Sequence, residues 1–131
     1  MVNDPVSDFI IRLKNAGMVR KEEVSLPYSK LKAAIADKLV DAGFLAATEK
    51  HGKKAKKSLD VVLKYDANGM SMIRGVKRVS KPGRRMYISV SEIHPVKFGK
   101  GKRILSTPLG VLTGEEARTK NVGGEELFII W

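Results

Sequence analysis

The chain has 131 residues, which allows one ordinary domain or two small ones that share a core. It contains no cysteine, which excludes disulfides, thiolate metal sites and a cysteine nucleophile; with no signal-peptide core or long apolar span, we expect a soluble intracellular protein without a membrane partner. The formal net charge of +11 favours a polyanionic partner, and residues 50–103 hold 16 lysines and arginines against three acids.

The N-terminal half alternates helix and strand signals. Asp4 can cap a helix that starts at Pro5 and ends near Gly17. A short strand is expected at Glu23–Pro27, and Ser29 caps a second helix that Gly43 ends. The strands expected after this helix are residues 44–49, 59–65 and 70–79, with the last two forming a hairpin around a turn at 66–69.

The C-terminal half has shorter strands and more glycines. Candidate strands are residues 87–90, 104–106, 111–112 and 127–131, and a capping box at Thr113 to Glu116 predicts a short helix. These patterns predict an α+β fold of two small packed domains, with a boundary inside residues 66–80 and no long flexible linker. Residues 1–70 would form an N-terminal α-β-α-β-β domain with a mixed sheet, and residues 71–131 a mostly β domain with a short helix.

A basic turn that ends on an aromatic residue is the first functional signal. It consists of Lys81, Pro82, Gly83, Arg84 and Arg85, with Tyr87 close behind. A tyrosine beside arginines can stack on an unpaired base or sugar while the arginines hold phosphates. The alternative is a charged hairpin turn with the tyrosine half-buried in a strand. The lysine-rich residues 50–57 are either a solvated loop or a non-specific phosphate contact.

Two polar segments form the second signal. Ser106 and Thr107 precede a turn at Gly110, and their hydroxyls suit 2′-OH groups, phosphates and base edges in a shallow RNA minor groove. A glycine such as Gly110 lets a backbone come close to its ligand. In the segment Gly123-Gly124-Glu125, a carboxylate near RNA should accept a hydrogen bond from a base amino group or hold an arginine in place. An ordinary loop and a tight turn are the alternatives.

The chain offers no catalytic set. Its acids show no paired arrangement, and His51 and His94 stand alone. Residues 99–102 suggest a phosphate loop, but they lack the glycine spacing and the following serine or threonine of the Walker pattern. We therefore expect no catalytic residue, no metal and no cofactor, and a protein that is not an enzyme. A small phosphate-handling enzyme using residues 99–103 is the enzymatic alternative.

The chain resembles the family of bacterial small-subunit ribosomal protein eight over nearly its whole length. Residues 4–8 with 12–16 look like the family's first helix, and residues 29–32 and 34–36 with 43–45 look like its second helix and next strand. Residues 78–85 with Tyr87 are similar to the central segment. The C-terminal signature is matched by Ser106-Thr107, Gly110-Val111, Thr113, Ala117-Arg118 and Gly123-Gly124-Glu125. The order and spacing of these blocks together make the resemblance specific.

The resemblance implies two α/β domains, a place in the small ribosomal subunit and primary binding to a helix in the central domain of 16S rRNA. It also implies contacts with ribosomal proteins five and twelve of the small subunit. Some members repress translation of their own operon mRNA, which is a regulatory alternative. A non-specific basic nucleic-acid-binding protein is a further alternative. Pro108 and Leu109 stand where many members have a serine and a lysine, which removes a hydroxyl and a cation from the expected RNA face.

The motifs and the resemblance together predict a set of rRNA-binding residues. The C-terminal half should make the main contact and the N-terminal half a smaller one. The predicted residues are Ser29, Lys30, Lys81, Pro82, Gly83, Arg84, Arg85, Tyr87, Ser106, Thr107, Gly110, Gly123, Gly124 and Glu125.

Overall fold

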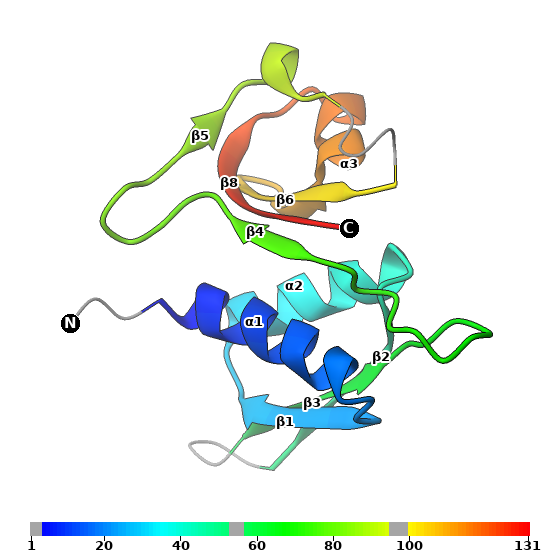
Figure 1. Cartoon of the computed structure of the whole chain (residues 1–131). Coiled ribbons are helices and arrows are strands. Elements are labelled where there is room, and N and C mark those ends of the chain that lie inside the picture. Colours follow the sequence, from blue (N-terminus) through cyan, green and yellow to red (C-terminus); the bar gives the residue numbers. More distant parts are fainter. Residues whose placement is uncertain (1–3, 53–56, 95–99) are drawn as a thin grey trace. The chain divides into compact units, whose positions relative to one another are not determined.

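The computed structural model describes residues 4–52, 57–94 and 100–131. The chain forms two compact units, each with its own sheet (Figure 1). The N-terminal unit is Phe9–Arg74, and the C-terminal unit joins Met1–Asp8 to Gly75–Trp131. Helices combined with antiparallel sheets confirm the α+β class.

The helices and strands of the described residues follow the chain in the order that Figure 1 labels. The helices are α1 (Pro5–Met18), α2 (Lys30–Asp41) and α3 (Gly114–Thr119), with a 3-10 turn η2 (Val90–Glu92). The strands of the N-terminal unit are β1 (Glu23–Pro27), β2 (Leu45–His51) and β3 (Ser58–Leu63). Those of the C-terminal unit are β4 (Val76–Arg78), β5 (Tyr87–Ile88), β6 (Lys102–Thr107), β7 (Gly110–Thr113) and β8 (Gly124–Ile130).

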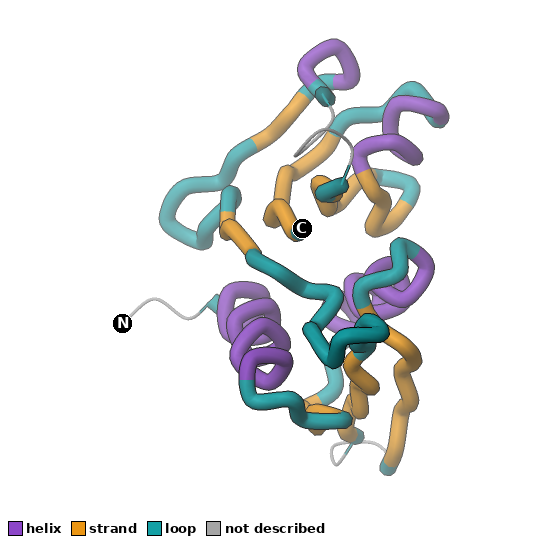
Figure 2. Tube along the Cα trace, turned by 45° about the vertical axis from the view of Figure 1, so that its right-hand side comes forward, coloured by secondary structure: helices purple, strands orange, loops and turns teal. Residues whose placement is uncertain are grey.

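The N-terminal unit packs two helices on one side of a three-stranded sheet, as Figure 2 shows from a second direction. The strand order is β1-β3-β2, and both pairings are antiparallel. The prediction of a mixed sheet for this half is therefore wrong. Alternate residues of β3 are buried, which is the pattern of a sheet with one face on the core. Ser29 caps α2 as expected, because its hydroxyl accepts a hydrogen bond from the Lys32 backbone N–H at 3.1 Å.

The hairpin expected at residues 59–79 does not extend as predicted. The Asp66 carboxylate accepts hydrogen bonds from the backbone N–H groups of Asn68 and Met70, so the turn forms. Beyond it, a single bridge joins Tyr65 and Ser71. Both edges of β3 are already occupied by β1 and β2, so no edge is free for a further strand. The last part of the segment instead becomes β4, which pairs with β8 of the C-terminal unit.

The C-terminal unit is built around a five-stranded antiparallel sheet. Its order is β4-β8-β6-β7, and β5 pairs with the same strand β8 as β4 does. Helix α3 packs on β6 and β7, and its N-cap is Thr113, whose capping box with Glu116 is present as predicted. Ala117 of this helix belongs to a buried cluster with Ile93, Leu105 and Leu112. The single tryptophan, Trp131, packs its ring against Gly75.

One ion pair ties the start of the chain to β4. Asp4 caps α1 by accepting hydrogen bonds from the backbone N–H and the hydroxyl of Ser7, at 3.2 and 2.6 Å. The Arg78 guanidinium donates to both Asp4 oxygens, at 3.1 and 3.2 Å, and only 8% of its side chain is exposed. Burial acts to raise the pKa of Asp4, but the hydrogen bonds from Arg78 and Ser7 outweigh it, so the pKa lies below its ordinary value.

The replacement Asp4→Asn tests this pair through its pH dependence. A carboxyl group with a lowered pKa stabilises the folded state above its unfolded pKa, and that stabilisation is lost as the pH falls through the folded pKa. We expect Asp4→Asn to lower the free energy of unfolding by about 1–3 kcal/mol at neutral pH, since a charge-assisted pair is broken. Below the folded pKa, the variant and the parent chain should converge.

Urea unfolding followed by Trp131 fluorescence measures this difference in the C-terminal unit. Asp8→Asn is the matched control, because Asp8 is an exposed acid in the first turn of the same helix. A loss of stability that stays the same size in acid would contradict the assignment.

Candidate nucleic-acid interface

A row of polar side chains crosses three strands of the C-terminal sheet. Glu125 of β8 is the register partner of Tyr87 on β5 and of Ser106 on β6. Direct partners in antiparallel strands point to the same face of a sheet, so the three side chains share one face. We call Tyr87, Ser106 and Glu125 the polar row. Sequence analysis predicted all three residues, and the structure brings them together.

Glu125 organises the middle of the row. Its Oε2 accepts hydrogen bonds from the Ser80 hydroxyl and, at 3.0 Å, from the Arg85 guanidinium. Ser80 is fully buried, and its oxygen also accepts the Met86 backbone N–H at 3.1 Å. Of the two roles expected for Glu125, holding an arginine is the one formed within the chain. Sequence analysis missed Ser80, because nothing in the local pattern distinguishes it from other serines.

The basic turn has the hairpin geometry that its residues favour. Lys81 and Arg84 exchange two backbone hydrogen bonds, at 3.0 and 2.9 Å, around Pro82 and Gly83. The side chains of Lys81, Arg84 and Arg85 are exposed. Tyr87 lies in a strand but is 71% exposed, so it does not serve the core. The turn therefore presents three cations and an aromatic ring to solvent.

The two hydroxyls at the end of β6 differ in their availability. The Thr107 hydroxyl donates to the Gly110 carbonyl at 2.7 Å and accepts the Leu109 N–H at 3.1 Å, so it closes the turn to β7. Gly110 has a φ of 110°, which favours glycine. Among the described residues, none hydrogen-bonds the Ser106 side chain. Ser106 is therefore free to meet a ligand, while Thr107 shapes the turn that carries Pro108 and Leu109.

The paired glycines let neighbouring backbones approach each other. A Cβ at Gly124 would lie 2.3 Å from the Ser106 carbonyl oxygen, and one at Gly123 would lie 2.5 Å from the Ile88 carbonyl oxygen. Both obstacles are backbone atoms of neighbouring segments, which cannot rotate away. These glycines thus keep β8 close to β6 and to the end of β5, and so hold the polar row together.

The residues predicted from the N-terminal half belong to the other unit. The Ser29 hydroxyl is used as the cap of α2, and Lys30 is exposed. Of the lysine-rich segment 50–57, residues 53–56 lie outside the described residues. Lys50 and Lys57 place their ammonium groups over the Tyr28 ring, at 5.6 and 5.3 Å from its centre. Sequence reasoning missed this contact, because Tyr28 lies far from both lysines in the sequence.

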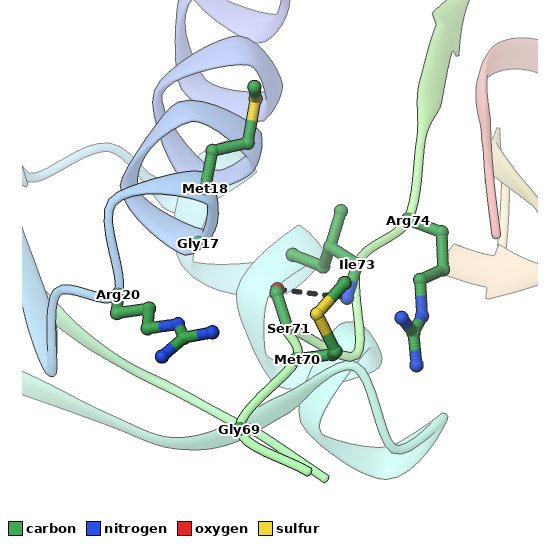
Figure 3. Close-up of a pocket in the computed structure, with 8 residues that line it drawn as sticks. All are labelled: Gly17, Met18, Arg20, Gly69, Met70, Ser71, Ile73 and Arg74. Carbon is green, nitrogen blue, oxygen red and sulfur yellow. Dashed lines mark hydrogen bonds between the residues drawn. The ribbon is translucent and has the colours of Figure 1, made fainter.

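A separate concave pocket of about 270 Å³ lies in the N-terminal unit (Figure 3). Exposed Met18 and Met70 contribute to its lining together with Arg20 and Arg74. None of the predicted site residues lines it. Across the described residues, no group of histidine and acidic side chains could hold a metal ion, and no helix is long and apolar enough to cross a membrane.

A polar row beside exposed cations on a basic chain is typical of proteins that bind nucleic acid. Comparison with known proteins agrees: residues 4–131 match the family described as ribosomal protein S8. The chain is 41% identical over 131 residues to small ribosomal subunit protein uS8 of Dehalococcoides mccartyi, and both chains are fully covered. It is 45% identical over 130 residues to the protein of that name from Dictyoglomus thermophilum, covering 99% of this chain and 98% of the relative.

The protein from Mycoplasma mobile with the same name is 42% identical over 131 residues, which cover all of this chain and 98% of that one. By class, the chain is thus a ribosomal protein. The chain belongs to the ribosomal protein S8 family, the small-subunit family that its sequence motifs suggested.

The replacement Gly124→Ala tests the close approach of β8 and β6. We expect it to lower the free energy of unfolding of the C-terminal unit by about 1–3 kcal/mol or more, because the new methyl group would overlap a backbone carbonyl. Gly83→Ala is the matched control: a Cβ at Gly83 meets nothing within 4 Å. Urea unfolding monitored by tryptophan fluorescence compares the two. Equal stability of both variants would show that β8 can shift without cost.

Proposed function

We propose that this protein is a structural component of the small ribosomal subunit that binds a helix in the central domain of 16S rRNA through the polar row. The observation that carries the proposal is the register of Tyr87, Glu125 and Ser106 on one face of three adjacent strands. Membership of the ribosomal protein S8 family supports the same assignment. The protein would act in the cytoplasm, within the ribosomal particle.

Each member of the row suits a different feature of a distorted RNA helix. The exposed Tyr87 ring can stack on a base that has left the helix. The Ser106 hydroxyl can donate to and accept from a 2′-OH or a base edge in the minor groove. Glu125 holds the Arg85 guanidinium, whose planar donors suit a phosphate oxygen pair. Shape and 2′-OH contacts would then provide specificity, and phosphate contacts most of the affinity.

The remaining members of the predicted set would support the row. Lys81 and Arg84 would hold phosphates near Pro82 and Gly83. Thr107, Gly110, Gly123 and Gly124 would keep the surface in shape. Ser29 and Lys30 would add contacts from the N-terminal unit. Assembly of the subunit, contacts with ribosomal proteins five and twelve, and binding of the chain's own operon mRNA stay predictions that rest on the family resemblance.

The test is binding of the purified protein to the central-domain rRNA stem, against a fully paired duplex of equal length, at several salt concentrations. We expect a preference for the stem that survives raised salt. Ser106→Ala should weaken binding to the stem by about 1 kcal/mol, as for a lost hydrogen bond, and leave duplex binding unchanged.

Ser91→Ala is the matched control for this variant, because Ser91 is an exposed serine of η2 in the same unit. Equal losses on stem and duplex would remove Ser106 from the reading surface. Binding that is equal on both RNAs and fades with salt would leave a non-specific basic protein, and duplex DNA bound equally well would point the same way.

Tyr87 offers an independent test of stacking. Tyr87→Ala should weaken binding to the stem by about 1–3 kcal/mol, the usual value for one base stacked on an aromatic side chain. Tyr87→Phe keeps the ring and should retain most of the affinity. Because Tyr87 is 71% exposed, neither change should alter the unfolding free energy by more than about 0.5 kcal/mol. A phenylalanine variant as weak as the alanine one would assign the effect to the hydroxyl instead.

A further inference from the structure

A concave basic surface, distinct from the polar row, lies on the C-terminal unit. Its volume is about 510 Å³. We call it the basic pocket, and five cationic side chains and one carboxylate contribute to its lining: Lys77, Arg78, Lys81, Arg84, Arg103 and Glu126. Of these, Lys81 and Arg84 belong to the set of rRNA-binding residues predicted from the sequence. The others come from β4, β6 and β8, which are far apart in the sequence.

Strand register explains why two of these cations, Lys77 and Arg103, meet. Lys77 and Arg103 are both register partners of Ile129, so they flank that residue on one face of the sheet. Arg103 and Ser106 are three residues apart on β6, and successive side chains of a strand alternate between its faces. The pair Lys77 and Arg103 therefore lies on the face opposite to the polar row.

The charges of the pocket are only partly balanced. Asp4 pairs with Arg78, and Glu126 accepts a hydrogen bond of 2.5 Å from Arg103. The Arg103 Nε also donates to the His94 carbonyl at 3.1 Å, so this guanidinium is held in place. Among the described residues, no carboxylate pairs with the three remaining cations, Lys77, Lys81 and Arg84.

We propose that the basic pocket binds backbone phosphates of RNA, as a second contact surface beside the polar row. Cations that share one concave surface repel each other, and an anionic ligand would relieve that repulsion. A guanidinium held in place beside lysine ammonium groups suits phosphate oxygens. An acidic protein is a weaker match, since protein interfaces favour aromatic centres and none of the described lining residues is aromatic. The choice of RNA as the source of the phosphate rests on the proposed function.

The salt dependence of binding to single-stranded oligouridylate tests the pocket in the full-length chain. Each phosphate neutralised on a single strand contributes a slope of about −0.7 to the plot of log affinity against log salt. We expect Lys77→Gln to make the slope shallower by about that amount. Lys120→Gln is the matched control, because Lys120 is an exposed lysine of the same unit that does not line the pocket. Equal changes in both variants would overturn the proposal.

Glu126→Gln makes a prediction of the opposite sign. It keeps the size of the side chain but removes the charge that compensates Arg103, so the slope should become steeper by about 0.7 and low-salt affinity should rise. A loss of folding cannot mimic a gain of binding, and circular dichroism of each variant shows that it is folded. An unchanged or weakened affinity for Glu126→Gln would count against phosphate binding here.

Two further probes separate the sources of the anion. These probes are inorganic phosphate and decaglutamate. If Lys77→Gln weakened the binding of either probe and left the binding of oligouridylate unchanged, the ligand would be a free phosphate or an acidic protein. That result would overturn the proposal. Failure of the basic-pocket proposal can be told apart from failure of the proposed function. Loss of the preference for the rRNA stem would refute the role of the polar row, whereas the Lys77 effect is measured on RNA of any sequence.

Discussion

Strand β8 is the element on which both surfaces of the C-terminal unit depend. One of its edges pairs with β6, and the other pairs with β4 at one end and β5 at the other. Because these partners come from distant parts of the chain, β8 alone fixes which of their side chains become neighbours. The close approach at Gly124 is the tightest point of this arrangement. Side chains of the row keep their spacing only while that approach is kept.

Three carboxylates of this unit each hold an arginine. Asp4 holds Arg78, Glu125 holds Arg85 and Glu126 holds Arg103. A free arginine side chain loses considerable rotamer entropy when it binds, and an arginine already fixed by a carboxylate loses less. The exposure of the three guanidinium groups differs: the Arg78 side chain is 8% exposed, and that of Arg85 is 50% exposed. The first pair therefore serves the fold, and the second is placed to serve a ligand.

Local signals in the sequence predicted local structure well. The caps at Asp4, Ser29 and Thr113 form as expected, since each depends on residues within one turn of a helix. The pairing of β4 with β8 was not predictable, because it depends on which strand edges are free in the folded sheets. For the same reason the three residues of the polar row were predicted from their local segments, but the hydrogen bonds from Ser80 to Glu125 and from Arg103 to Glu126 were not.

A β-bulge decides which face of the sheet each glutamate serves. The register of β6 moves from Phe128 to Glu126 between Ile104 and Leu105, so Leu127 is the extra residue of β8. Without the bulge, with Leu127 as an ordinary residue of the strand, strict alternation would put Glu126 on the face of Phe128. With it, Glu126 shares a face with Arg103, while Glu125 shares one with Ser106. The two adjacent glutamates lie on opposite faces in either case, and the bulge decides which of them shares the face of Arg103 and which that of Ser106.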